Sequence, residues 1–230
     1  MAEFLSSFSL FPLVLTIGAY QFGLWCQKKF KTSLCNPIMI AVLVVLGVLL
    51  LFRIPNDTYQ QGISAISWLL TPATTCFALP LYNQLKLLKK NLSAILLGVF
   101  AGSVTSLFFV LLLCKLFSVN DPLTVSLLPK SITSAIGIVI SEENGGFAAL
   151  TAVTIVFTGI FGGLIGSALC KLLKIEDPIS QGVAFGTAAH IGGTARASEL
   201  GSLQGAVSSL SLVVAGILTA ILMPFFLSLI

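Results

Sequence analysis

The sequence predicts an all-α polytopic integral membrane protein of about seven to eight membrane segments, some of them discontinuous or re-entrant. Hydrophobic residues make up 57% of the chain and charged residues only 9%, whereas a soluble domain typically has about 25% charged residues. The mean hydropathy is +1.06. Because one span requires about 20 apolar residues, the 230 residues of the chain accommodate these segments with short loops. We expect a single transmembrane domain over residues 1–230.

The apolar residues fall into strong and weak runs. Proline, glycine, hydroxyl or charged residues interrupt the weak runs, so broken or re-entrant helices are expected there. From residue 63 onward a weak run is followed by a strong one three times, which does not match a simple two-fold inverted repeat. The strong runs are residues 4–25 and 37–52, which form the N-terminal spans, and 92–117, 147–173 and 203–230; the weak runs are 63–82, 123–141 and 179–200.

Lysines in the short loops indicate the orientation in the membrane. The loops at 26–36 and 83–91 each carry three lysines, and lysine-rich loops stay in the cytoplasm. The N-terminus is therefore predicted to lie outside. After residue 118 the charges obey this rule only if run 123–141 re-enters and turns back, so we favour a re-entrant or broken segment there.

Four ionisable residues, Lys130, His190, Arg196 and Glu199, are placed by these runs at membrane depth, where such groups are costly and usually functional. Arg196 and Glu199 are three residues apart, so they either form a structural pair on one helix face or contribute charge to a site. His190 is either a proton carrier, because imidazole titrates near neutral pH, or a neutral hydrogen-bonding group between helices.

Lys130 follows Pro129, which interrupts any helix because it lacks an amide proton. The hydroxyl residues after it, Ser131, Thr133 and Ser134, are suited to capping a half-helix that begins near Ser131. The positive end of such a half-helix, with Lys130 beside it, would attract a small anion. The alternative is a lysine at a helix end that extends its ammonium group to the membrane surface.

Residues 182–199 form the most unusual stretch of the chain. Gly192-Gly193, just after the only histidine, is expected to unwind, and unwound backbone at mid-membrane forms the binding site of many transporters. Five small or polar residues are spaced four apart and are predicted to line one helix face. They are Gly182, Gly186, His190, Thr194 and Ser198.

A third broken element is predicted at 69–82, where Pro72 and Pro80 flank Thr74 and Thr75. The hydroxyl groups either satisfy the freed backbone of a kinked span or face substrate. In the long runs, glycines four residues apart allow close helix contact, which we interpret as packing within the chain, with a homodimer face as the alternative.

Several function classes lack support. The net charge of +4 is small and dispersed, so we expect no nucleic-acid partner. The sequence shows no phosphate-binding glycine loop, no serine–histidine–acid set and no paired metal ligands. We therefore expect no enzyme activity, no cofactor and no metal.

The three interrupted segments resemble the LrgB/CidB family of bacterial membrane proteins. The resemblance covers about residues 69–230 and rests on Pro-Ala-Thr at 72–74, Pro-Leu-Tyr at 80–82, Leu-Pro-Lys-Ser-Ile-Thr at 128–133, residues 145–152, and above all 182–199 with 205–210. The chain departs from the family pattern at Thr71, Ala135 and Ala189, where a glycine, a proline and a serine are usual, and at Ile191-Gly192. These departures lie within the predicted site, so its substrate preference is expected to differ from that of better-known members.

The resemblance implies one of two functions in the bacterial plasma (inner) membrane. Family members are similar to a plastid glycolate/glycerate translocator, and some are associated with pyruvate uptake. Others are described as holin-like or antiholin-like regulators of murein hydrolase activity and cell lysis, with a small LrgA/CidA-type membrane partner. We favour transport of a small monocarboxylate, with Lys130 and Arg196 offsetting its charge and a proton coupled at His190. The predicted substrate-binding residues are Pro72, Thr74, Lys130, Ser131, Thr133, Ser134, His190, Thr194, Arg196 and Glu199.

Overall fold

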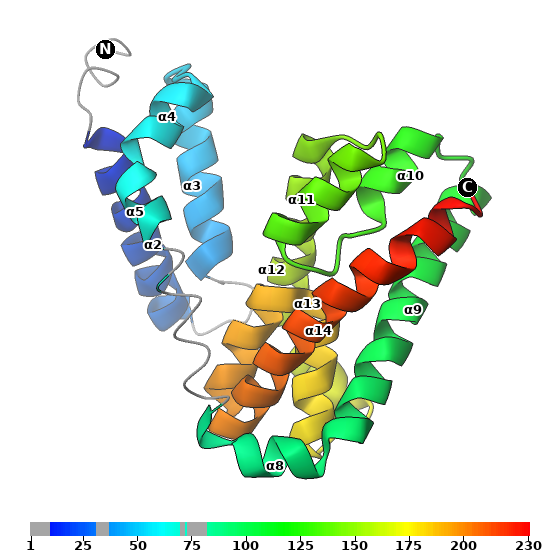
Figure 1. Ribbon diagram of the computed structural model, residues 1–230. Helices are drawn as coiled ribbons and strands as arrows, with labels where there is room; N and C mark the ends of the chain where they lie inside the picture. Colours follow the sequence, from blue (N-terminus) through cyan, green and yellow to red (C-terminus); the bar gives the residue numbers. More distant parts are fainter. Residues whose placement is uncertain (1–9, 31–36, 70–71, 73–81) are drawn as a thin grey trace. The chain divides into compact units, whose positions relative to one another are not determined.

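The computed structural model describes residues 10–30, 37–69, 72 and 82–230. Within these ranges every regular element is an α-helix, as the composition predicts. The chain divides into two compact units, Met1–Cys76 and Phe77–Ile230 (Figure 1).

The first unit pairs α2 (Phe11–Phe30) with α3 (Pro37–Leu51) and continues into α4 (Asn56–Gly62) and α5 (Ser64–Trp68). The pairing is close because a side chain at Gly23 would collide with the backbone of Pro37. Thr16 of α2 also shares a hydrogen bond of 2.8 Å with the Tyr59 hydroxyl of α4. The predicted span 4–25 lies partly outside the described residues.

In the second unit, α8 (Leu85–Lys90) precedes α9 (Leu92–Leu116), and α12 (Ala148–Leu172) and α14 (Ser202–Leu227) follow later in the chain. These last three are the described helices that are long and apolar enough to cross a membrane. With 25 or 26 residues each, they are about 38 Å long, more than the hydrocarbon core of about 30 Å. Large side chains such as Phe157, 66% exposed, and Phe225, 67% exposed, suit lipid rather than water. The chain is therefore a helical membrane protein.

Run 123–141 folds as two short helices, α10 (Asp121–Leu127) and α11 (Ser134–Glu143). At 7 and 10 residues they are about 10 and 15 Å long, so neither crosses a bilayer alone. The C-terminal end of α10, at Ser126, and the C-terminal end of α11, at Ser141, are joined where α12 begins. The Ser126 hydroxyl accepts the Phe147 amide at 2.7 Å, while the Thr151 hydroxyl donates to the Ser126 carbonyl at 3.0 Å and to the Ser141 hydroxyl at 2.7 Å. Residues 121–143 are thus a first hairpin that enters and leaves at one end, as the charge distribution predicts.

Helix α13 (Pro178–Leu200) is a second hairpin. Its backbone is not helical at Ala189 (φ −133°, ψ 15°) or at His190 (φ 40°, ψ −126°). A side chain at Gly193 would collide with the carbonyl oxygen of Phe185. Gly193 and Phe185 are eight residues apart, and in a continuous helix they would lie about 12 Å from each other. Because they are in contact, the chain must turn back at the break.

Contacts with α12 show the same reversal. The first arm, residues 178–188, runs along α12 from Gly166 toward Gly159, which contacts the His190 ring. The second arm, residues 191–200, then returns toward Ser167, whose hydroxyl accepts a hydrogen bond from Arg196 at 3.0 Å. Both arms pack on α14, because Gly186 of the first arm and Thr194 of the second both contact Ser208.

Asp177 fixes the outer end of the second hairpin. Its carboxylate accepts hydrogen bonds from the Ser180 amide at 2.8 Å and the Ser180 hydroxyl at 2.7 Å, which caps the first arm. The Ser180 hydroxyl and then its amide lower the pKa of Asp177 below its ordinary value. The stability that this cap contributes to the fold is therefore fully present at a pH above the ordinary pKa of aspartate. It is lost as the pH falls through the lowered pKa of Asp177.

The two hairpins point in opposite directions. The first opens at the end of the unit where α12 begins, and the second opens at the end where α12 finishes, and each is followed by a helix of membrane length, α12 or α14 (Figure 1). This is the arrangement of an inverted-topology repeat. The periodicity of weak and strong runs does not reveal this relation within residues 121–227, because it does not show which way each weak run turns.

Glycines at close helix contacts explain this packing. Gly98 and Gly102 of α9 lie against Val183 and Thr187 of the second hairpin. Gly163 of α12 lies against the backbone of Gly192. These stripes pack within the chain, as favoured from the sequence, and the homodimer face stays a prediction.

We predict that Gly193→Ala lowers the melting temperature of the protein purified in detergent. In a continuous helix this change would stabilise the fold by up to about 1 kcal/mol, whereas in the hairpin the added methyl group collides with Phe185. The matched control is Gly47→Ala in α3, where nothing lies within 4 Å of the added carbon. A melting temperature that rises equally in both variants would contradict the hairpin.

Candidate functional site

The inner ends of the two hairpins approach each other halfway along the long helices. At the inner end of the first hairpin, the Ser131 hydroxyl lies 2.9 Å from the hydroxyl of Ser106, in the middle of α9. At the inner end of the second, the His190 ring lies 2.8 Å from the Ile155 carbonyl, near the middle of α12. Lys130 lines one cavity together with Ala189, so both breaks border the same region.

Lys130 is the charged group at this meeting point. It is half-buried, and its ammonium group donates to the Ser131 hydroxyl at 3.2 Å. In the described part of the chain no carboxylate pairs with it, since the one ion pair found there joins Arg196 and Glu199. The adjoining cavity has a volume of about 530 Å³, and its other walls, from α12 and α13, are largely apolar. A lysine at membrane depth without a counter-ion is a candidate anion site.

His190 is held in one tautomer. Its Nε2 lies 2.8 Å from the Ile155 carbonyl oxygen, which can only accept, so Nε2 carries the proton. Nδ1 is buried and has no hydrogen-bond partner among the described residues. The neutral ring therefore presents an unused acceptor beside the break, which is compatible with the predicted proton carrier and with a structural hydrogen bond.

Thr194 performs a structural task. Its hydroxyl donates to the His190 carbonyl at 2.8 Å and bonds the Ser208 hydroxyl of α14 at 2.8 Å. It thus ties the first turn of the second arm to α14. The four-residue spacing predicted that five small or polar residues line one helix face. That prediction is wrong, because the break divides these residues between two arms, both of which pack on α14.

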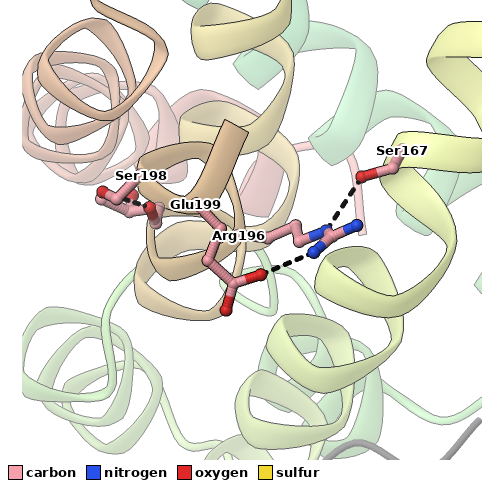
Figure 2. Close-up of polar contacts among 5 residues, drawn as sticks. Ser167, Arg196, Ser198 and Glu199 are labelled. Carbon is pink, nitrogen blue, oxygen red and sulfur yellow. Dashed lines mark hydrogen bonds and ion pairs between the residues drawn. The ribbon is translucent and has the colours of Figure 1, made fainter. Parts of the chain in front are cut away.

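Arg196 and Glu199 lie on the second arm beside Ser167 of α12 (Figure 2). Arg196 donates through Nε to Ser167 at 3.0 Å and pairs through Nη1 with Glu199 at 2.5 Å. The pair lies on the second arm toward its outer end, and Arg196 lines neither cavity near the hairpin tips. The prediction that Arg196 and Lys130 hold one carboxylate together does not agree with this placement, because the turn at His190 carries Arg196 back toward the end of α12.

Two local predictions require correction. The half-helix after Pro129 begins at Ser134 rather than near Ser131, and its N-cap residue, Thr133, makes no side-chain capping bond. The second break precedes Gly192-Gly193, which is helical. Those two glycines serve the close contacts with α12 and the first arm instead.

Pro72 and Thr74 cannot be placed at the site. Thr74 lies outside the described residues, and Pro72 is the one described residue between 70 and 81. Their predicted role in binding stays a prediction.

Sequence reasoning missed a group of hydroxyl side chains where the hairpins meet. Ser103, Ser106 and Thr219 of the long helices line a small cavity with Ser131 and Thr187. Their only signal is a hydroxyl residue within an apolar run, which is ambiguous, because serine and threonine often bond their own helix.

Comparison with known proteins identifies the family. The model of the LrgB-like family matches residues 16–229. The chain belongs to the LrgB-like family. The match reaches farther toward the N-terminus than the segments that carried the resemblance, so the first unit also belongs to the family pattern.

Relatives extend over nearly the whole chain. The holin-like protein CidB of Staphylococcus aureus (strain Mu50 / ATCC 700699) is 35% identical over 216 residues, 94% of each chain. The antiholin-like protein LrgB of Bacillus subtilis (strain 168) is 33% identical over 221 residues, 96% of each chain. No solved structure matches the chain.

We predict that His190→Gln destabilises the protein less than His190→Ala does. The glutamine amide retains a donor for the Ile155 carbonyl, whereas alanine removes one hydrogen bond, worth about 1 kcal/mol. Melting temperatures in detergent measure the difference. If the two variants unfold at the same temperature, the bond to Ile155 contributes nothing to the fold.

Proposed function

We propose that this LrgB-like protein carries small monocarboxylates, of the pyruvate, glycolate and glycerate class, across the bacterial cell membrane. The observation that carries the proposal is the Lys130 ammonium group at the inner end of the first hairpin, beside a cavity and without a carboxylate partner in the described residues. A structural lysine at this depth would need an acidic partner to offset the cost of its charge. A substrate carboxylate supplies that charge only while it is bound.

The two opposed hairpins support the same function. Discontinuous helices that meet at mid-membrane form the substrate sites of many carriers, and access alternates as one repeat moves against the other. Here each hairpin separates the meeting point from one end of the second unit. We propose that His190 couples a proton to this cycle, since its Nδ1 is an unused acceptor next to the break.

A second candidate is regulation of cell lysis. The relatives' names describe holin-like and antiholin-like proteins and say nothing of transport, so they favour a regulator that acts through a small LrgA/CidA-type membrane partner. Such a role requires helix surfaces for the partner, but it does not require a buried cation without a counter-ion.

We predict that proteoliposomes containing this chain take up labelled pyruvate or glycolate in a saturable manner, and faster with an inward proton gradient. Lys130→Gln should reduce uptake about tenfold or more, because it removes a charge-assisted contact with the substrate. Arg196→Gln should retain most of the uptake, since Arg196 is paired with Glu199 and Ser167. The matched control is Lys171→Gln at the exposed end of α12.

Absence of uptake by well-folded wild-type protein, with or without an added LrgA/CidA-type partner, would favour the lysis regulator. Equal uptake by Lys130→Gln and wild type would refute the role of Lys130 while leaving transport intact.

A further inference from the structure

The second cavity is small and is lined by hydroxyl groups. It lies between the inner ends of both hairpins, α9 and α14, and has a volume of about 10 Å³. The hydroxyl groups come from all four elements. They belong to Ser103, Ser106, Ser131, Thr187 and Thr219.

Two of these hydroxyl oxygens are fully buried and have no hydrogen-bond partner among the described residues. Ser106 and Ser131 bond each other, whereas Ser103 Oγ and Thr187 Oγ1 are buried without a hydrogen bond to any described residue. Ser103 is 4% exposed and Thr187 is 6% exposed. A buried hydroxyl without a partner is costly, and nearly all such groups in folded proteins find one. The cavity therefore requires an occupant that can bond both.

Size and charge limit that occupant. A volume near 10 Å³ has room for about one water molecule, or for one oxygen atom of similar size. The Lys130 ammonium group lies 3.2 Å from the Ser131 hydroxyl on the cavity wall, so the local field favours an anionic oxygen and disfavours a metal cation. Hydroxyl groups donate to such an oxygen, and bonds to a charged acceptor are stronger than those to water.

We propose that this cavity is the subsite for one carboxylate oxygen of the substrate, with Ser103 and Thr187 as its hydrogen-bond donors. The inference rests on the proposed transport of monocarboxylates and adds two specificity-determining residues to it. A water molecule fills the subsite between substrates, and the carboxylate oxygen displaces it. An uncharged amide of the same shape offers only a neutral oxygen, so its bonds to the hydroxyl groups are weaker and Lys130 adds no attraction of opposite charges.

Binding to the full-length chain purified in detergent tests the subsite. Titration calorimetry with pyruvate, and with pyruvamide as the uncharged probe, should show binding of pyruvate alone. Ser103→Ala and Thr187→Val should each weaken pyruvate binding about tenfold or more, as expected for the loss of a bond to a charged group. Thr187→Ser keeps the hydroxyl and should bind as the wild type does. Thr187→Val also preserves the methyl group that packs on Gly102.

The matched controls remove hydroxyl groups that bond only their own helix. They are Ser209→Ala, whose hydroxyl donates to the Gly205 carbonyl, and Thr154→Val, whose hydroxyl donates to the Leu150 and Thr151 carbonyls. Melting temperatures verify that every variant is folded. Wild-type affinity in both Ser103→Ala and Thr187→Val would overturn the subsite and leave the proposed transport standing.

Two further outcomes would also overturn the subsite. If the wild type bound no monocarboxylate, the proposed transport would fail with it. If sodium bound the wild type, and the two variants lost sodium rather than pyruvate, the cavity would be a cation site.

Discussion

The second unit depends on one constraint, which is that backbone polar groups inside a membrane must find partners within the protein. Both hairpins break this continuity halfway across, and a helix resumes directly after each break. The Thr133 carbonyl accepts the Gly137 amide where α11 begins, and the Thr194 hydroxyl donates to the His190 carbonyl in the first turn of the second arm. The surrounding long helices keep lipid away from the breaks, so the inner ends of the hairpins can remain unwound without exposing bare backbone to hydrocarbon.

Close helix approach makes this enclosure possible. In lipid, helices associate through van der Waals packing and hydrogen bonds rather than the hydrophobic effect, which favours small residues at their contacts. Gly159 and Gly163 bring α12 against the second hairpin, and Gly193 brings its two arms together. The first hairpin adds hydrogen bonds, because the Thr151 hydroxyl donates to the Ser126 carbonyl and to the Ser141 hydroxyl. Gly137, which lies against Ile155, brings this hairpin close to α12 as well.

The same enclosure gathers polar groups where the two hairpins meet. Lys130 supplies a positive charge without an acidic partner in the described residues, and the neighbouring hydroxyl groups supply donors. Arg196, which carries the same charge, is already neutralised by Glu199 near the outer end of the hairpin. The difference between these two cations is one of position, since each lies beside a hydroxyl group but only one has a carboxylate within reach.

The sequence by itself determined the helical membrane fold class, the three long spans after residue 91, the interrupted segments at 123–141 and 179–200, and the family, because composition and hydrophobic length reflect local demands of the bilayer. It also identified Lys130 and His190, because an ionisable residue within an apolar run is conspicuous. Only the tertiary structure decided which way each weak segment turns, that Arg196 returns toward the end of α12, and that Ser103 and Thr187 meet at one cavity. The placement of Arg196 depends on a reversal at Ala189 and His190, which precedes the glycine pair where the sequence predicted unwinding. Contacts with residues far away in the chain, such as the Ile155 carbonyl, stabilise this reversal.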